Sequence, residues 1–330
     1  MSYSSQEEVL RLAQNFMESR ILLSGAELNV FTILSHAPLT AKEVSDRTGT
    51  DMQALTTLLD ALSAIGLLIK HNDAYRCTPS LTPLLAGDQP GSVLHMILHA
   101  AHLWQRWSSL TNVVAGKRES EGTSRPSRSA EEMQAFIGAM HVVAEPQARG
   151  IIAAVNPGSA KALLDVGGAS GTYTIAFLQA VPEMRATLFD MPEVVEMARE
   201  RLGGAGMLDR VTLVPGDFYR DEFPRGHDLA FVSAIIHQNS LDQNVNLYRK
   251  IFRSLNRGGR IVIRDHVMDN NRIYPKDGAI FAVNMLLGTS GGGTYTYGEI
   301  KTGLSQAGFA GMRLIRKGEH MDALVEAFKP

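Results

Sequence analysis

The 330-residue chain contains a single cysteine, Cys77, so it cannot form an intramolecular disulfide. Its first residues, MSYSSQEEVL, lack the basic start and the apolar stretch of a signal peptide. Its most notable uncharged run, GAIFAVNMLLGTSGGGTYTYG, is interrupted by a glycine cluster and does not predict a membrane span. These absences predict a cytoplasmic protein without a membrane partner.

Basic charge is also scarce, because 32 Lys and Arg residues face 34 Asp and Glu residues for a net charge of −2. A nucleic-acid binder usually presents a basic face. The one local basic excess, GKRESEGTSRPSRS at 116–129, is polar throughout and is interpreted as a solvated linker. We therefore expect no nucleic-acid partner.

This linker divides the chain into a helical domain over 1–115 and a second domain over 130–330. The first domain reads as helix, turn, helix and a hairpin from Leu68 to Thr78, which is the pattern of a winged helix. Thr40 with Glu43 predicts a capping box, and Thr50 or Asp51 can cap the next helix. A DNA-binding regulator is the alternative function of another class, but residues 48–69 contain no Lys, Arg, His or Asn to read a groove. Self-association as a homodimer is favoured.

Two features near the linker have simple structural interpretations. His95, His99 and His102 share helical spacing, but no Cys, Asp or Glu accompanies them between residues 90 and 110, so we expect packing rather than a metal site. Residues 130–155 are helical in pattern, and Pro146 predicts a break in that helix.

The second domain alternates short apolar runs with helical stretches, which indicates a mostly parallel sheet covered on both faces. The runs lie at 162–166, 186–189, 211–214, 229–236 and 260–263. Each is followed by polar or glycine residues, in order Asp165 with Gly167, Asp190, Asp217, His237 and Asp265. Because ligands of open α/β sheets bind outside the carboxyl ends of the strands, these residues predict one shared crevice. Two later strands near the carboxyl terminus predict a closing hairpin with an antiparallel member.

The glycine-rich turn after the first run, Gly167, Gly168 and Gly171, predicts close approach of a nucleotide-like cofactor to the backbone and a helix amino terminus. Its spacing is not G-x-G-x-x-G, and the chain has no G-K-[ST] phosphate loop, so a nicotinamide-dependent dehydrogenase is disfavoured. Asp190 is placed to bind ribose hydroxyls, although Asp190, Pro192 and Glu193 can also form a capping box.

The residues at the other strand ends can likewise belong either to a binding site or to an ordinary turn or helix cap. Asp217 lies in PGDF, which is also common turn chemistry. His237 is not needed to begin the following helix, because Ser240 and Gln243 can cap it. This leaves an imidazole at the crevice, with Asp265 at the neighbouring strand end to orient it.

These segments together resemble the S-adenosylmethionine-dependent small-molecule O-methyltransferases, a family that includes plant caffeic acid and animal hydroxyindole enzymes and many bacterial natural-product enzymes. The segments that carry the resemblance are LLDVGGASG, LFDMPEVV, PGDFY, IIHQ and GGRIVIRDHVMD, with AELNVFTIL and LTTLLDALSAIGLL before the linker. The resemblance implies a class I methyltransferase-like, doubly wound α/β sheet with an antiparallel last strand, preceded by a mainly helical, winged-helix-like dimerisation domain.

The resemblance also implies roles for single residues. S-adenosylmethionine, with S-adenosylhomocysteine as product, would contact Asp165, Gly167, Gly168, Gly171, Asp190, Met191, Asp217 and Phe218. His237, beside Asp265, would act as general base on a hydroxyl of a small aromatic substrate. Phe136, Met140 and Met285 match positions that line the substrate pocket, although core packing is the alternative for all three. No metal is implied.

Four departures from the family pattern modify these expectations. Ala169 replaces a glycine, a mild change if its φ stays negative. Gln238 replaces an Asp, Asp265 stands where Glu is frequent, and Thr294 with Tyr295 replaces a Glu-Arg pair. A weakened base network predicts slower transfer or a restriction to acidic phenols, and it leaves methylation of carbon or nitrogen, or a non-methylating reaction with the same cofactor, as alternatives.

Overall fold

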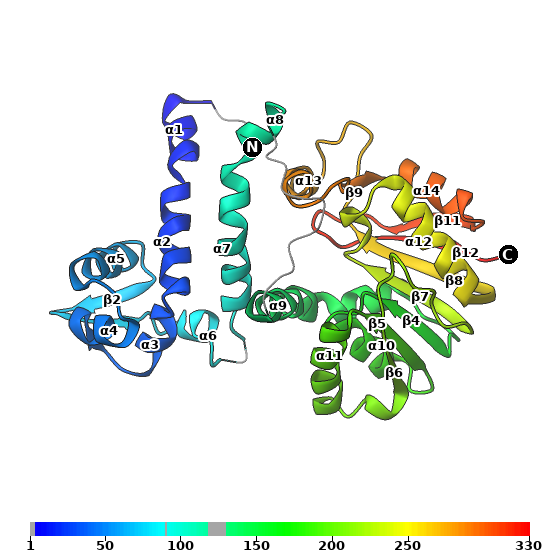
Figure 1. The fold of residues 1–330 in the computed structure, drawn as a ribbon, viewed down its shortest axis with the longest axis horizontal. Helices are drawn as coiled ribbons and strands as arrows, with labels where there is room; N and C mark the ends of the chain where they lie inside the picture. The colour runs from blue at the N-terminus through cyan, green and yellow to red at the C-terminus, as the bar shows by residue number, and fades with distance from the viewer. Residues whose placement is uncertain (1–3, 90, 118–129) are drawn as a thin grey trace. The chain divides into compact units, whose positions relative to one another are not determined.

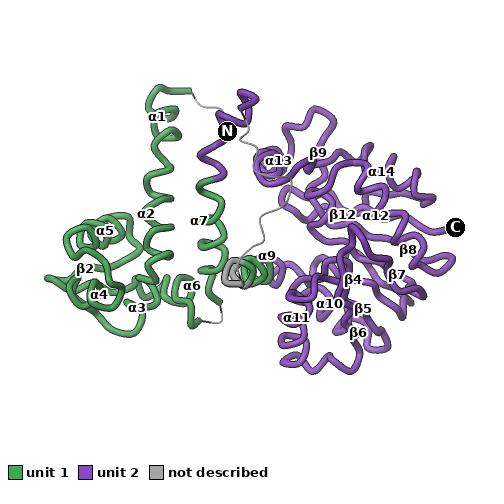
Figure 2. The backbone as a smooth tube through the Cα atoms, viewed as in Figure 1, with its two compact units in different colours: residues 1–105, 128–142 green, residues 106–127, 143–330 purple. Residues whose placement is uncertain are grey.

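The computed structural model describes residues 4–89, 91–117 and 130–330. The predicted linker at 116–129 lies outside these residues except for its first two positions. The chain forms two compact units, residues 1–105 with 128–142 and residues 106–127 with 143–330 (Figures 1 and 2). Each unit is described separately below.

The first unit is helical with one small sheet. Its helices are α1 (Gln6–Gln14), α2 (Phe16–Glu27), α3 (Val30–His36), α4 (Ala41–Thr48), α5 (Met52–Ala64), α6 (Thr82–Leu85) and the greater part of α7 (Leu94–Ser108). The sheet has the order β1-β3-β2 and contains β1 (Leu39–Thr40), β2 (Leu68–His71) and β3 (Ala74–Cys77). Phe31, Leu59 and Tyr75 lie in the buried core of this unit. The winged-helix pattern predicted from the sequence is therefore present.

The helix caps and the hairpin of this unit form as the sequence predicts. Thr40 and Glu43 form a complete capping box at α4. Asp51 caps α5 by accepting a hydrogen bond from the backbone N–H of Ala54. The hairpin β2–β3 pairs in antiparallel register from Leu68 with Cys77 to His71 with Ala74.

The long helix α9 (Ala130–Val155) passes from the first unit into the second at residue 143. Pro146 lies inside this helix, so the predicted break is wrong. A proline removes one backbone donor from a helix, which weakens it locally. Here the residues on the carboxyl side of Pro146, including Ile151, Ile152 and Val155, are buried in the core of the second unit, and this burial favours the continuous helix.

The second unit contains a seven-stranded sheet in the order β11-β12-β8-β7-β4-β5-β6. Its strands are β4 (Ala162–Val166), β5 (Arg185–Asp190), β6 (Val211–Pro215), β7 (His227–Ser233), β8 (Leu255–Asp265), β11 (Ala310–Arg316) and β12 (Ala323–Phe328). The five strands from β6 to β8 are parallel, and β12 pairs antiparallel with both β8 and β11. The predicted closing hairpin is therefore present.

Helices cover both faces of this sheet (Figure 1). The helices of this unit, besides the second half of α9, are α8 (Leu110–Val114), α10 (Thr172–Ala180), α11 (Pro192–Gly204), η1 (Leu208–Arg210), η2 (Ile236–Gln238), α12 (Leu241–Ser254), α13 (Lys276–Gly288) and α14 (Tyr297–Gln306). The unit also contains a small parallel pair, β9 (Val267–Met268) and β10 (Tyr295–Thr296). One face of the sheet packs against α12 and α14, and the other packs against α10 and the second half of α9. Alternate residues of each strand therefore enter different cores.

Candidate active site

The carboxyl ends of the parallel strands meet at one edge of the sheet. Val166 at the end of β4 pairs with Phe189 on one side and Val232 on the other. The chain runs outward from β4 to β5 and β6, then returns to β7 and β8 on the opposite side of β4. This reversal between β4 and β7 is a topological switch point, which is where open α/β sheets bind ligands.

The glycine turn leads from β4 into α10 at this edge. Gly167 and Gly171 have φ values of 65° and 76°, a region in which glycine avoids the steric penalty of a side chain. Ala169 also has a positive φ, 48°. The condition under which its replacement of glycine was a mild change is therefore not met, and a left-handed alanine carries a strain of about 1 kcal/mol.

Close approach at two of these glycines involves the protein itself. A β-carbon on Gly167 would lie 2.5 Å from Cδ1 of Ile235, and one on Gly168 would lie 2.6 Å from Cγ of Leu188. Internal packing therefore explains why side chains are excluded at both positions. The contact with Ile235 also joins the glycine turn to the segment that carries His237, two residues further along.

Asp190 ends β5 and faces the same turn. Its Oδ2 accepts a hydrogen bond of 2.8 Å from the N–H of Ala169, and its Oδ1 accepts one of 2.8 Å from the N–H of Met191. Helix α11 begins after Met191 without a side-chain cap, so the alternative capping box is not formed. Burial raises the pKa of Asp190, although the two backbone N–H groups oppose this shift. A carboxylate has about four acceptor positions, so two stay available for a ligand.

Asp165 lies on the face of β4 that packs against α10, where it is 2% exposed. Its Oδ2 accepts a 2.6 Å hydrogen bond from the hydroxyl of Thr174 in α10. Burial, reinforced by the nearby charge of Asp190, raises the pKa of Asp165 to about 7. This hydrogen bond therefore joins α10 to β4 next to the glycine turn.

Asp217 and Phe218 follow β6 in a turn. Asp217 accepts a 2.9 Å hydrogen bond from the N–H of Tyr219, which is the turn chemistry that its sequence context allows. Phe218 lies beside Tyr219 with ring centroids 4.5 Å apart. Both predicted residues are half-buried, whereas Met191, the remaining predicted cofactor contact, is 40% exposed.

His237 lies in the 3₁₀ turn η2, four residues beyond the end of β7. Ser240 and Gln243 form the capping box of α12, as predicted, so the imidazole is not used to begin that helix. Its Nδ1 lies 2.9 and 3.0 Å from the two carboxylate oxygens of Asp265. The His237 side chain is 11% exposed and that of Asp265 is 1% exposed. The expected pairing of these two strand ends is therefore present.

The charge state of Asp265 determines which nitrogen of this imidazole carries the proton. Burial raises the pKa of Asp265, but the charge and hydrogen bond of His237 and the N–H of His266 outweigh burial and lower it. The ionised carboxylate accepts the Nδ1 proton of His237. Nε2 is then the basic nitrogen.

Four further residues, which the sequence interpretation missed, hold the turn around His237. The N–H of Gly293 donates a 2.8 Å hydrogen bond to the His237 carbonyl, and a β-carbon on Gly292 would lie 2.4 Å from that same oxygen. Buried Asn239 donates to Asn244, which in turn donates to the carbonyl of Ile236. The glycine cluster at 291–293 was the available signal, but its partner could not be identified from the sequence.

An aromatic side chain lies against the imidazole. The ring of Phe281 in α13 meets that of His237 at 87° with centroids 4.8 Å apart, and it lies 5.2 Å from the ring of His266. The predicted Met285, one turn further along α13, is 8% exposed. Phe136 and Met140 are half-buried on α9 in the first unit, so their assignment to the substrate pocket stays a prediction.

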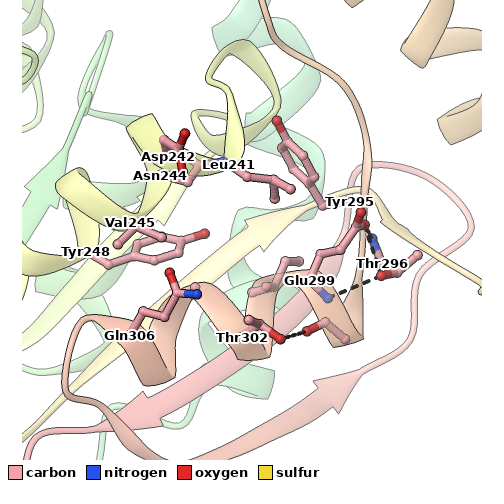
Figure 3. A pocket seen from close by; sticks show the side chains of 13 residues that line it. Leu241, Asp242, Asn244, Val245, Tyr248, Tyr295, Thr296, Glu299, Thr302 and Gln306 are labelled. Carbon is pink, nitrogen blue, oxygen red and sulfur yellow. Dashed lines mark hydrogen bonds between the residues drawn. The ribbon is translucent and has the colours of Figure 1, made fainter.

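A cavity of about 400 Å³ lies elsewhere in the second unit, between α12 and α14 (Figure 3). Asn244, Tyr248 and Tyr295 contribute to its wall, and Glu299 is bonded there to Thr296. None of the predicted site residues lines this cavity. It is distinct from the strand edge that carries them.

Within the described residues, no group of three His, Cys, Asp or Glu side chains is arranged to hold a metal. The helices of that same part of the chain include none long and apolar enough to cross a bilayer.

Comparison with known proteins decides the family. The model of the O-methyltransferase domain matches residues 107–310. The chain belongs to the O-methyltransferase family. The model of the O-methyltransferase dimerisation domain matches residues 10–85, which contain the winged helix. The resemblance inferred from the sequence is confirmed, and the protein is an enzyme of the methyltransferase class.

Individual relatives agree with this assignment. The chain is 31% identical over 312 residues to the tetracenomycin polyketide synthesis 8-O-methyl transferase TcmO of Streptomyces glaucescens, covering 93% of this chain and 92% of the relative. It is 28% identical to the 3-hydroxy-5-methyl-1-naphthoate 3-O-methyltransferase of Streptomyces sahachiroi, with coverages of 92% and 90%. The human N-acetylserotonin methyltransferase, solved in complex with SAM, shares the fold at a TM-score of 0.83 and 24% identity over 100% of this chain and 99% of that one.

Proposed function

We propose that this O-methyltransferase uses S-adenosylmethionine to methylate a hydroxyl group of a small aromatic molecule, with His237 as the general base. The pairing of His237 Nδ1 with Asp265 at the switch-point edge supports this proposal most directly. The closeness of Ile235 to Gly167 also supports one continuous site for the base and the glycine turn. A base and a cofactor turn on opposite edges of the sheet would have argued against transfer.

The residues at the switch point fit this cofactor. Asp190 retains acceptor positions for two ribose hydroxyls, and the turn residues Gly167–Gly171 lead into the amino terminus of α10. Asp217 and Phe218, at the end of β6, would lie toward the adenine. When bound, the cofactor supplies a methyl group on a positively charged sulfur, which is a strong electrophile. The protein therefore needs to align the acceptor and remove one proton.

His237 performs the proton removal in this proposal. Asp265 accepts the Nδ1 proton, so Nε2 is free to take the proton of the substrate hydroxyl, and the carboxylate then stabilises the imidazolium that forms. A positioned base accelerates such a step by about 10²–10⁴-fold, or roughly 3–5 kcal/mol. Alignment of two reactants can contribute roughly 7–11 kcal/mol. Loss of the base should therefore slow transfer without abolishing it.

An aromatic acceptor is supported by two observations. The rings of Phe281 and His237 meet edge to face, which provides an apolar, aromatic wall beside the base. Both curated relatives described above are named for O-methylation, one in polyketide synthesis and one of a hydroxynaphthoate. We propose that Met285, one turn beyond Phe281 on α13, also contributes to the acceptor pocket.

Self-association is the second part of the proposal. The exposed side of α1 and the start of α2 carries large apolar side chains that are 50–55% exposed, namely Val9, Leu10, Leu12, Phe16 and Met17. Large apolar side chains exposed within one short segment are typical of an interface. Together with the match to the dimerisation domain, it supports a homodimer formed through the first unit.

The experiment that tests the catalytic assignment compares His237→Ala with the unmodified enzyme on a panel of phenols, with product mass measured by mass spectrometry. We expect turnover to fall by about 10²–10⁴-fold while the affinity for S-adenosylhomocysteine, measured by calorimetry, is unchanged. Equal losses of turnover and affinity would remove the role of His237 as base. Products methylated on carbon or nitrogen would correct the acceptor atom and leave the cofactor assignment intact.

A further inference from the structure

Arg264 is a buried cation whose hydrogen-bonding capacity is not satisfied by the protein. It is 3% exposed, its Nη1 donates a 3.2 Å hydrogen bond to the hydroxyl of Ser233, and its Nε has no partner. The guanidinium lies 5.2 Å from the centroid of the Tyr173 ring, and the hydroxyl of Tyr173, also buried, has no partner either. Buried donors without partners are rare because each loses its hydrogen bonds to water. Two of them side by side suggest a place for a ligand.

The position of Arg264 relates this cluster to the cofactor turn. Arg264 pairs in register with Ser233, the last residue of β7, and β7 lies next to β4, which leads into the glycine turn. Two strand spacings, about 10 Å, therefore separate β8 from β4. Because Arg264 and Asp265 are consecutive in β8, their side chains lie on opposite faces of the sheet. The Arg264 cluster is on the α10 face, whereas the base pair is on the α12 face.

No carboxylate of the described chain forms an ion pair with Arg264. Asp265 is directed toward His237, and Asp165 accepts the hydroxyl of Thr174. Asp322 is the remaining acid near Arg264, but its Oδ2 accepts a 2.7 Å hydrogen bond from Arg316, and its Oδ1 has no partner. A buried guanidinium without a paired anion is costly for the protein to keep. An anion supplied by the ligand would remove this cost.

We propose that Arg264, positioned by Ser233, binds the α-carboxylate of the methionine portion of S-adenosylmethionine, with the Tyr173 hydroxyl as an additional donor. The guanidinium fork matches a carboxylate in geometry and charge, and both Nε and the Tyr173 hydroxyl are donors without an acceptor. This inference rests on the cofactor assignment in the proposed function. It adds the residue that recognises the amino-acid end, which none of the strand-end residues found in the sequence supplies.

Binding of three ligands without any reaction tests the proposal. S-adenosylhomocysteine carries the carboxylate, its carboxamide replaces that group by a neutral amide, and 5′-methylthioadenosine lacks the amino-acid portion. Calorimetry on the unmodified enzyme should show the carboxylate form binding about 10- to 100-fold more tightly than the carboxamide. In Arg264→Gln this ratio should fall close to one, while the affinity for 5′-methylthioadenosine stays unchanged.

Two additional variants keep the test decisive. Arg264→Lys retains the charge and so the fold, but it lacks the fork, and we expect a severalfold lower ratio. Arg253→Gln removes an exposed arginine at the carboxyl end of α12, and as the matched control it should leave the ratio unchanged. A ratio near one in the unmodified enzyme, or an undiminished ratio in folded Arg264→Gln or Arg264→Lys, would overturn the role of Arg264. Failure of all three ligands to bind would instead overturn the proposed function.

Discussion

Gly292 lies against the backbone of the proposed general base, since a β-carbon at this position would be 2.4 Å from the carbonyl oxygen of His237. The contact is with backbone, which cannot rotate away as a flexible side chain can. Gly292 and Gly293 therefore hold the His237 carbonyl in position, one by close approach and the other by a hydrogen bond. It explains a stretch of sequence that has no role in the cofactor turn.

Gly292→Ala should displace His237 and lower turnover by about 10- to 100-fold, because small errors in the position of a catalytic group cost orders of magnitude in rate. Affinity for S-adenosylhomocysteine should change little. The matched control is Gly293→Ala, where a β-carbon would meet no atom within 4 Å. Steady-state kinetics of the two variants check this prediction, and an equal response of both would contradict it.

Asp265→Asn should lower turnover at least as much as Asp265→Ala, by about 10²–10⁴-fold. Oδ1 of Asp265 accepts the N–H of His266 at 2.8 Å, so an asparagine keeps its oxygen there and turns its amide nitrogen toward His237. That nitrogen donates to Nδ1 and places the imidazole proton on Nε2, where the base is needed. If the pair had only a structural role, asparagine would instead be the milder change, and kinetics with thermal unfolding separate the two results.

Asp190→Asn should weaken binding of S-adenosylhomocysteine by about 10- to 100-fold. The asparagine amide would face one of the two backbone N–H groups that the carboxylate now accepts, and it would offer fewer acceptors to ribose. Calorimetry with S-adenosylhomocysteine and its 2′-deoxy analogue checks the assignment. The unmodified enzyme should prefer the ribose form, and Asp190→Asn should lose that preference, whereas the exposed control Asp242→Asn should keep it.

Asp165 predicts a pH dependence of stability. Its pKa in the folded protein is raised to about 7, so the folded state holds a proton that the unfolded state releases near pH 4. Its contribution to stability is therefore lost as the pH rises from about 4 to 7, and at most about 4 kcal/mol is involved. Asp165→Asn should gain thermal stability relative to the unmodified protein between pH 5 and pH 8. A constant difference in melting temperature across this range would show that Asp165 is ionised in the fold.

The sequence predicted those features that depend on neighbours along the chain. The caps at Thr40 and Ser240 were identified because each cap and its partner are three residues apart. The strands, their common edge and the pairing of His237 with Asp265 followed from the rule that parallel strands end together. Family resemblance then supplied the chemistry of the edge.

The features that were wrong or missed depend on contacts between distant segments. The helix continues through Pro146 because residues beyond it are buried in the core of the second unit. The left-handed conformation of Ala169 is fixed by the turn, with its N–H bonded to Asp190, and not by the preference of alanine. Gly292, Phe281 and Arg264 gain their importance only from partners that lie 31 to 55 positions away, at His237 or Ser233. A local pattern contains no record of such partners.

Strand β8 supplies adjacent residues to two different cores, Arg264 to one side of the sheet and Asp265 to the other. Removing a single residue upstream in this strand would exchange their directions, so that a carboxylate would take the place of Arg264 and a guanidinium would face His237. The proposed carboxylate binding by Arg264 and the proposed support of the base by Asp265 would be lost together, although the hydrophobic composition of the strand would be almost unaltered. Length, as well as composition, is therefore under constraint in this strand, and enzymes with the same sheet should tolerate substitutions there far more readily than insertions or deletions.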